Sequence, residues 1–156
     1  VMVETPAAVM NAEAILGEVD FVSIGTNDLT QYTMAADRLL GDLAHLNNPW
    51  QPAVLKMIKM TVEGAQRASV TAGKKKYVSV CGEAAADPAL AVVLIGLGVD
   101  TLSMNAGAIP AVAAVLKSVT KEKAQQIAAI ALQQISSAEA KESARQALPI
   151  LDELGL

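Results

Sequence analysis

The sequence predicts an α/β fold built on a parallel sheet. Short β-branched apolar runs alternate with longer segments of helical spacing. Prolines stand near the starts of these segments and glycines just after their ends, as helix termini favour. With 53% hydrophobic and 18% charged residues among 156, the chain can bury a substantial core. Because parallel strands need long connections, usually helices, these features together indicate βα units.

The elements are expected in the following order along the chain. Four buried strands are predicted at residues 1–3, 20–24, 77–80 and 100–104. Helices are predicted between and after them, at residues 7–16, 29–40, 52–69, 88–97 and 109–117. The alternation of the two kinds of segment predicts a sheet whose strands all run in one direction.

The last forty residues have a different character. Residues 121–134 and 139–148 are rich in alanine and favour helix. Ser136 followed three residues later by Glu139 has the form of a capping box at the start of the final helix. We therefore divide the chain into an α/β unit, residues 1–118, and a helical tail, residues 119–156.

Composition excludes several classes of function. Twelve Lys and Arg against 16 Asp and Glu give a net charge of −4, and no basic run exceeds residues 74–76, so nucleic-acid binding is not expected. No apolar run approaches the roughly 20 residues of a membrane span, and no signal sequence opens the chain, so membrane insertion is not expected. A single cysteine excludes an internal disulfide and favours a cytoplasmic protein.

Polar side chains follow each predicted strand at the point where it ends. Glu4 follows the first strand, Asn27 and Asp28 the second, Cys81 the third and Asn105 the fourth. In parallel α/β folds the loops at the carboxyl ends of the strands converge on the ligand. The sequence therefore predicts a functional site at this edge.

The charged residues of this group have two interpretations each. Glu4 and Asp28 are hard oxygen ligands suited to Mg²⁺, with water and phosphate in the remaining positions; alternatively, Asp28 caps the following helix and Glu4 meets a surface lysine. Arg38 can bind a carboxylate or phosphate through two parallel hydrogen bonds. Alternatively, it pairs with Asp37 or Asp42 on the surface.

The single cysteine is also open to two interpretations. At a strand end beside a glycine, the thiol of Cys81 can act as a proton donor or a nucleophile. The alternative is an inert buried cysteine, since no histidine in the sequence supports a Cys–His pair. The only histidine, His45, is expected in a polar loop without a role.

Five segments resemble a known family. They are VETPAA at 3–8, DFVSIGTNDLTQY at 20–32, ADR at 36–38, VCGE at 80–83 and GLGVDTLSM at 96–104. Together they resemble the carboxyl-terminal part of Enzyme I of the bacterial sugar phosphotransferase system, over residues 1–117. The SIGTNDLTQY stretch is the most specific, and it also has relatives in phosphoenolpyruvate synthase and pyruvate phosphate dikinase.

The resemblance implies a (β/α)8 barrel of the TIM type that binds phosphoenolpyruvate and Mg²⁺. In that family the phosphoryl group passes to a histidine on a separate domain and then to a small carrier protein for sugar uptake, and pyruvate is released. Glu4 and Asp28 match the magnesium ligands. Asn27, Asp28 and Arg38 match phosphoenolpyruvate-binding positions, and Cys81 matches the proton donor to the enolate.

The resemblance covers half of such a barrel. A full barrel takes about 250 residues, and the phosphate-accepting histidine and the first four strands are not in this sequence. Residues 1–118 are therefore expected to form the second half-barrel, inactive alone, stabilised by its other half, by association as a homodimer or by a swapped partner. The alternatives are a noncatalytic interaction or assembly module, and a fragment of pyruvate phosphate dikinase or phosphoenolpyruvate synthase.

Overall fold

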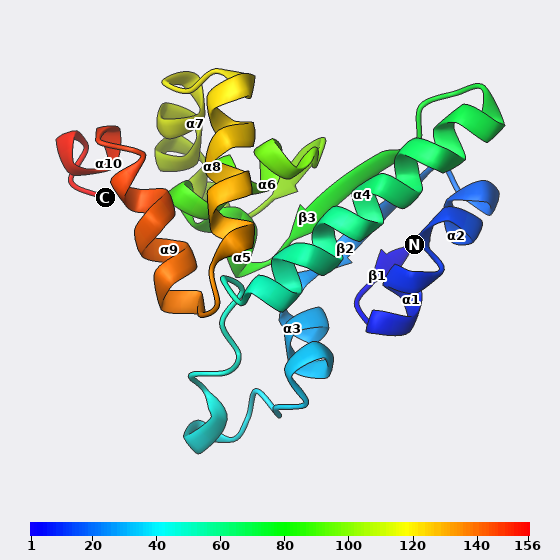
Figure 1. Cartoon of the computed structure of the whole chain (residues 1–156), viewed down its shortest axis with the longest axis horizontal. Coiled ribbons are helices and arrows are strands. Elements are labelled where there is room, and N and C mark those ends of the chain that lie inside the picture. Colours follow the sequence, from blue (N-terminus) through cyan, green and yellow to red (C-terminus); the bar gives the residue numbers. More distant parts are fainter.

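Four parallel strands form the sheet in a computed structural model that describes residues 1–156. The strands pair in chain order (Figure 1) and are β1 (Met2–Val3), β2 (Phe21–Gly25), β3 (Tyr77–Cys81) and β4 (Thr101–Ser103). All four lie where the apolar runs predict them, and the predicted α/β class is confirmed.

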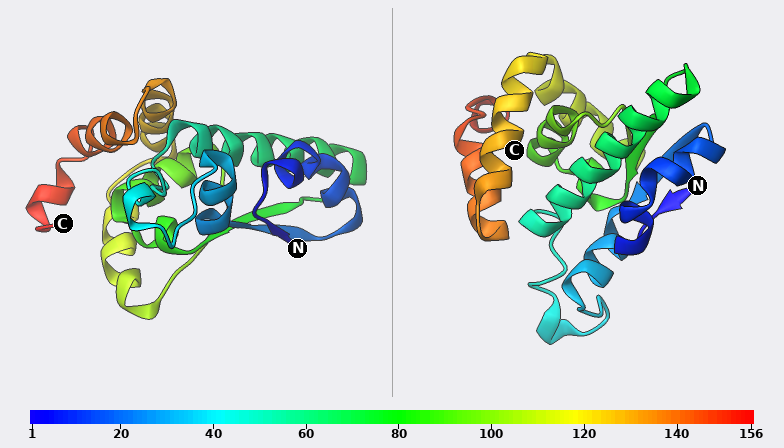
Figure 2. Two further views of the ribbon diagram at one scale, coloured as in Figure 1. Left: turned by 90° about the horizontal axis from the view of Figure 1, so that it is seen from below. Right: turned by 45° about the vertical axis from the view of Figure 1, so that its right-hand side comes forward.

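Helices connect the strands and cover one side of the sheet. Figure 2 shows α2 and α4 on the same side of the strands. The helices of this part are α1 (Pro6–Met10), α2 (Ala12–Glu18), α3 (Thr26–Met34), α4 (Pro52–Ala72), α5 (Glu83–Ala86), α6 (Pro88–Leu97) and α7 (Ile109–Lys117), with short 3-10 helices at η1 (Gly41–Leu43) and η2 (Ala106–Ala108). Parallel strands in sequential order, with helices following them, are what the second half of a barrel requires.

The prediction of one helix over residues 29–40 is wrong at both ends. Helix α3 begins at Thr26, and it ends where Ala35 adopts a left-handed conformation with φ 50°. Beyond it, the Asp37 carboxylate accepts a hydrogen bond from the Leu39 amide and fixes a turn. The apolar pair Leu39 and Leu40 suggested a continued helix, but both side chains are exposed.

Alternate strand residues separate a packed face from an open face. Val22 and Val80 are fully buried beneath the helices. On the opposite face Phe21 and Tyr77 are about half exposed and lie side by side in register. In a complete barrel this open face would be the interior, where the other half supplies packing partners.

The carboxyl-terminal tail is helical, as predicted, and consists of α8 (Lys121–Gln133), α9 (Ser137–Gln146) and α10 (Ile150–Glu153). Helix α8 packs so closely on α6 that a Cβ at Gly96 would overlap the Ala124 carbonyl oxygen. Ile127 of α8 is fully buried in the same core as the strands. The tail thus shares one core with the α/β unit, and the boundary at residue 118 stays a prediction.

The predicted capping box also forms. The Ser136 hydroxyl accepts a hydrogen bond from the Glu139 amide at 3.2 Å, and the Glu139 carboxylate accepts one from the Ile135 amide at 3.3 Å. None of the helices combines the length and the apolar character that crossing a bilayer would demand.

Candidate functional site

The carboxyl ends of the strands bring the predicted polar residues to one edge of the sheet. The last residue of β1 pairs with the residue just before Gly25, and Glu4 directly follows β1. Gly25 in turn pairs with Cys81, and Cys81 pairs with Ser103. This register places the loops after all four strands at the same level, as the sequence predicts.

Two cavities open at this edge and share a wall. The larger, of about 640 Å³, is lined by Asn27, Cys81, Gly82, Glu83, Ala86, Asp87, Ser103, Met104 and Asn105. The smaller, of about 330 Å³, is lined by Asn27, Thr30, Arg38, Leu39, Ala44, Asn47, Pro49 and Glu83. Asn27 and Glu83 belong to both linings, so they stand between a thiol-lined side and an arginine-lined side.

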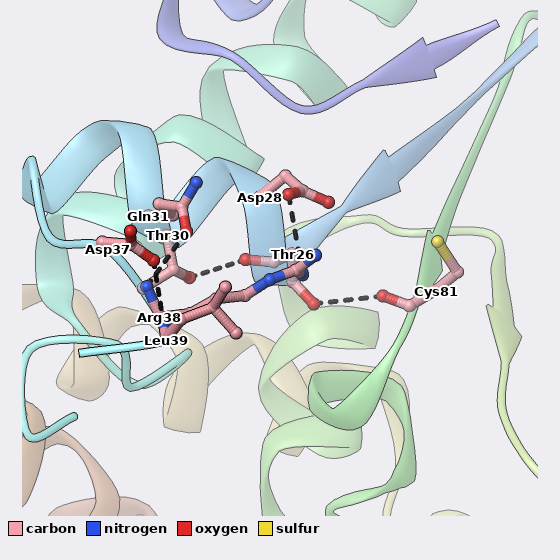
Figure 3. Close-up of polar contacts among 8 residues, drawn as sticks. All are labelled: Thr26, Asp28, Thr30, Gln31, Asp37, Arg38, Leu39 and Cys81. Carbon is pink, nitrogen blue, oxygen red and sulfur yellow. Dashed lines mark hydrogen bonds and ion pairs between the residues drawn. The ribbon is translucent and has the colours of Figure 1, made fainter. Parts of the chain in front are cut away.

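Close contact between the ends of β2 and β3 builds the shared wall. The Thr26 hydroxyl donates a hydrogen bond to the Cys81 carbonyl at 3.0 Å (Figure 3). Gly82 has φ +98°, and a Cβ there would lie 3.3 Å from the Thr26 hydroxyl and 3.5 Å from the Asn27 side-chain oxygen. The backbone angle favours glycine at this position, and the space beside it is tight.

Cys81 is half-buried and lines the larger cavity. Its Sγ donates to the Ile24 carbonyl at 3.5 Å, whereas its carbonyl oxygen faces Thr26 (Figure 3). Cys81 is therefore not the buried residue of the alternative interpretation, and its role in chemistry stays a prediction. His45 lies in the loop around η1, with Nδ1 3.2 Å from the Asp42 carbonyl.

Arg38 folds back onto the start of α3 and pairs with Asp28. Its guanidinium lies 3.6 Å from the Asp28 carboxylate (Figure 3), and the side chains are 48% and 35% exposed respectively. The interpretation in which Arg38 pairs with Asp37 or Asp42 is therefore wrong. The capping role for Asp28 is also wrong, because Asp28 lies inside the first turn and Gly25 is the N-cap residue.

Glu4 reaches across the end of β2. A Cβ on Gly25 would lie 2.6 Å from the Glu4 Oε2, so the carboxylate lies directly over this glycine. None of the five ion pairs in the chain involves Glu4, so the expected contact with a surface lysine does not form.

The donor set at this edge fits Mg²⁺ by its chemistry. Nowhere in the chain do three or more His, Cys, Asp or Glu side chains gather in a group able to hold a metal. Mg²⁺ is usually held by only one or two carboxylates and fills its other positions with water and substrate phosphate. Glu4, directly after β1, and Asp28, in the first turn of the helix after β2, supply that number of oxygen ligands, although neither side chain lines the two cavities.

Some cavity residues were not singled out from the sequence as candidates. Asp87 lines the larger cavity and accepts a hydrogen bond from the Trp50 indole at 3.0 Å. Ser103 lies at the end of β4 and lines the same cavity. The position of Ser103 at a strand end could have identified it from the sequence. The contact between Trp50 and Asp87 gave no such signal, because it joins residues 37 positions apart.

Comparison with known proteins identifies the family. Residues 1–121 match the PEP-binding domain of the PEP-utilising enzymes. The chain is 46% identical over 147 residues to the phosphoenolpyruvate-protein phosphotransferase of Streptomyces coelicolor, covering 94% of this chain and 25% of that protein. It is 42% identical over 139 residues to the protein of the same name from Haemophilus influenzae, covering 89% of this chain and 23% of that protein.

A third relative carries a different name. The chain is 45% identical over 133 residues to the multiphosphoryl transfer protein of Xanthomonas campestris, covering 85% of this chain and 15% of that protein. This chain therefore spans about a quarter or less of the length of these relatives. It belongs to the family of PEP-utilising enzymes and corresponds to their PEP-binding domain.

Proposed function

We propose that this chain is the phosphoenolpyruvate-binding part of a phosphoenolpyruvate-protein phosphotransferase. The observation that carries the proposal is the convergence of Asn27, Arg38 and Cys81 on two adjoining cavities at the carboxyl edge of the sheet. The names of the relatives support it, because they describe transfer of a phosphoryl group from phosphoenolpyruvate to protein.

Arg38 and Asn27 are the residues that we propose bind the anionic substrate. Guanidinium groups bind phosphate and carboxylate bidentately, and the Asn27 amide can donate beside it. In the free chain Arg38 contacts Asp28 at 3.6 Å, and both side chains are partly exposed. Such a pair contributes little stability, so a dianionic ligand can displace it at small cost.

Glu4 and Asp28 are the residues that we propose hold Mg²⁺, with Asp28 also facing the substrate. When bound, Mg²⁺ would neutralise charge on the phosphoryl group as it is transferred. Releasing Arg38 from Asp28 would leave the guanidinium to the substrate and the carboxylate to the metal. The two charges now paired would then serve two different ligands.

Cys81 is the residue that we propose protonates the product. When the bond between phosphorus and the bridging oxygen breaks, the organic product is the enolate of pyruvate. Transfer of the thiol proton to its terminal carbon gives pyruvate and leaves a thiolate on Cys81. The phosphoryl group itself passes to a histidine outside these residues, so this chain alone is expected to be inactive in turnover.

We extend the proposal to the partners expected from the resemblance. These are a small histidine-bearing phosphocarrier protein and a second copy of the chain as a homodimer, in the cytoplasm. The open face bearing Phe21 and Tyr77 supports an additional packing partner, since both rings are about half exposed. Light scattering after gel filtration gives the oligomeric state.

A titration followed by NMR tests the function, because it detects even weak binding. Phosphoenolpyruvate with Mg²⁺ is expected to shift the amide resonances of Asn27, Arg38 and Gly82 in the wild-type chain. Asp28→Asn should lose this response while keeping its fold, whereas Asp42→Asn, at an exposed carboxylate that forms no ion pair with Arg38, should keep it. Absence of shifts at these amides at saturating phosphoenolpyruvate would reject the proposal.

A further inference from the structure

We infer that Trp50, through its hydrogen bond to Asp87, is a positioning residue that holds the loop bearing Arg38 against the thiol side of the site. This inference rests on the proposed function. The loop comprises residues 35–51, between α3 and α4, and is called here the Arg38 loop. Trp50 touches neither reacting group, and its effect is exerted through Asp87.

The Arg38 loop has little regular structure to hold it. Its only such element is the 3-10 turn η1, and Leu39 is 85% exposed. Loops longer than about 12–15 residues without secondary structure are uncommon inside domains and are usually functional. Backbone hydrogen bonds within the loop, such as Leu43 to Leu40 and Leu46 to Leu43, fix its turns locally, whereas contacts at its two ends attach it to the helices on either side.

At its first end the loop is attached to α3. The Arg38 amide donates to the Gln31 side-chain oxygen at 3.0 Å, and the Arg38 guanidinium pairs with Asp28. Both contacts appear in Figure 3. These contacts tie Arg38 to the helix that follows β2, but they do not reach the segment that follows β3.

At its second end the loop is attached to the other side of the site. Trp50 is 2% exposed, and its indole Nε1 donates to the Asp87 Oδ2 at 3.0 Å. The Asp87 Oδ1 accepts from the amides of Ala89 and Leu90, at 2.9 and 3.1 Å, and so caps α6. One carboxylate thus joins the loop to the helix that begins just after the Cys81 segment.

Asp87 also lines the larger cavity together with Cys81. The hydrogen bond from Trp50 therefore links the arginine-lined side of the site to its thiol-lined side. Substrate bound between Arg38 and Cys81 requires these two sides at a fixed separation, because catalysis depends on the reacting groups being held in place. The link supplies that constraint.

Two variants break the link from opposite sides. Trp50→Phe keeps an aromatic ring in the core but removes the donor. Asp87→Asn can keep the cap of α6 through its amide oxygen, while its NH₂ group opposes the indole N–H. Ser136→Ala is the matched control, because it removes the hydroxyl cap of α9 in the tail.

The measurements are amide hydrogen exchange without ligand and the dissociation constant for phosphoenolpyruvate with Mg²⁺. Each variant is expected to speed exchange of amides in the Arg38 loop and to raise the dissociation constant about tenfold, as loss of a hydrogen bond to a charged group implies. The double variant should bind no more weakly than either single variant. In Asp87→Asn the indole N–H proton of Trp50 should exchange with solvent faster than in the wild type.

A purely structural role for Trp50 predicts a different pattern. The melting temperature would fall, but loop exchange and the dissociation constant would stay at the wild-type values, as in Ser136→Ala; this result would overturn the inference. Fully additive effects in the double variant would overturn it as well. If the wild-type chain shows no response to phosphoenolpyruvate, the proposed function fails, and loop exchange alone still decides whether the link holds the loop.

Discussion

The two edges of the sheet use their charged side chains differently. At the amino edge the charges are paired with neighbours: Asp20 lies 2.9 Å from Lys74, and Asp100 pairs with Lys75. Lys76, which is 5% exposed, donates to the Val19 carbonyl at 2.7 Å. These contacts connect the segment before β3 to the residues that precede β2 and β4, and so support the fold.

At the carboxyl edge the charges are left more available. The only ion pair there joins Arg38 and Asp28 at 3.6 Å, and Glu4 lies against Gly25 without an ion-pair partner. In this sheet the charged pairs at the amino edge support the fold, whereas the charged groups at the carboxyl edge can exchange their present contacts for a ligand. Substitutions of equal chemistry at the two edges should therefore separate stability from binding.

The largest difference is expected from matched cation substitutions. Arg38→Met should weaken phosphoenolpyruvate binding about 100-fold, since hydrogen bonds to charged groups contribute about 1.5–3 kcal/mol. Lys74→Met removes a cation from an exposed pair at the amino edge and should leave binding unchanged. NMR titration of both variants measures this. Equal losses of affinity would show that general charge, and not the edge, governs binding.

The strands and the site edge could be predicted because their signals are local. Each apolar run is a few residues long, and alternation with helices fixes the strand direction. The parallel order then places Glu4, Asp28 and Cys81 at one edge without any knowledge of side-chain contacts.

The Arg38 loop could not be predicted in the same way. Leu39 and Leu40 continue an apolar spacing, but the left-handed Ala35 ends the helix before them. Alanine gives no signal for that conformation, which glycine or asparagine usually supplies. The contact of Trp50 with Asp87 depends on the tertiary fold, which brings together residues from separate elements.

A large effect on stability, without loss of binding, is expected at Lys76. Lys76→Ala removes the hydrogen bond to the Val19 carbonyl and the buried aliphatic chain, so the free energy of unfolding should fall by about 2 kcal/mol. Urea denaturation measures the loss, and Lys76→Met separates the ammonium from the aliphatic packing. Unchanged stability in Lys76→Ala would contradict a structural role for the amino edge.

A smaller effect on binding is expected at Gly25. Gly25→Ala would place a Cβ 2.6 Å from the Glu4 Oε2, so the carboxylate must move. Magnesium-dependent binding should then weaken by about tenfold, the equivalent of about 1.4 kcal/mol. Gly17→Ala is the control, because no atom lies within 4 Å of its new Cβ. If both variants keep wild-type affinity for Mg²⁺, Glu4 is not a ligand.

The smallest effect is the pH dependence of the amino-edge pairs. The hydrogen bond from Lys74 and its charge lower the pKa of Asp20 below the ordinary 3.8, and the hydrogen bond to Asp100 raises the pKa of Lys75 above 10.5. A lowered acid pKa contributes stability that is present above 3.8 and is lost as the pH falls through the folded-state pKa. A raised lysine pKa contributes stability that is present below 10.5 and is lost as the pH rises through the folded-state pKa.

Both pairs are therefore intact around neutral pH, and they predict no change of stability there. Because Asp20 and Lys75 are well exposed, solvent screens both pairs. Stability should therefore change only slightly at the acid and alkaline ends of the pH range. Asp20→Asn should reduce the loss of stability between pH 5 and pH 3, as measured by urea midpoints, and leave phosphoenolpyruvate binding at pH 7 unchanged. If Asp20→Asn loses stability in acid as much as the wild type does, the acid sensitivity arises from other groups in the chain.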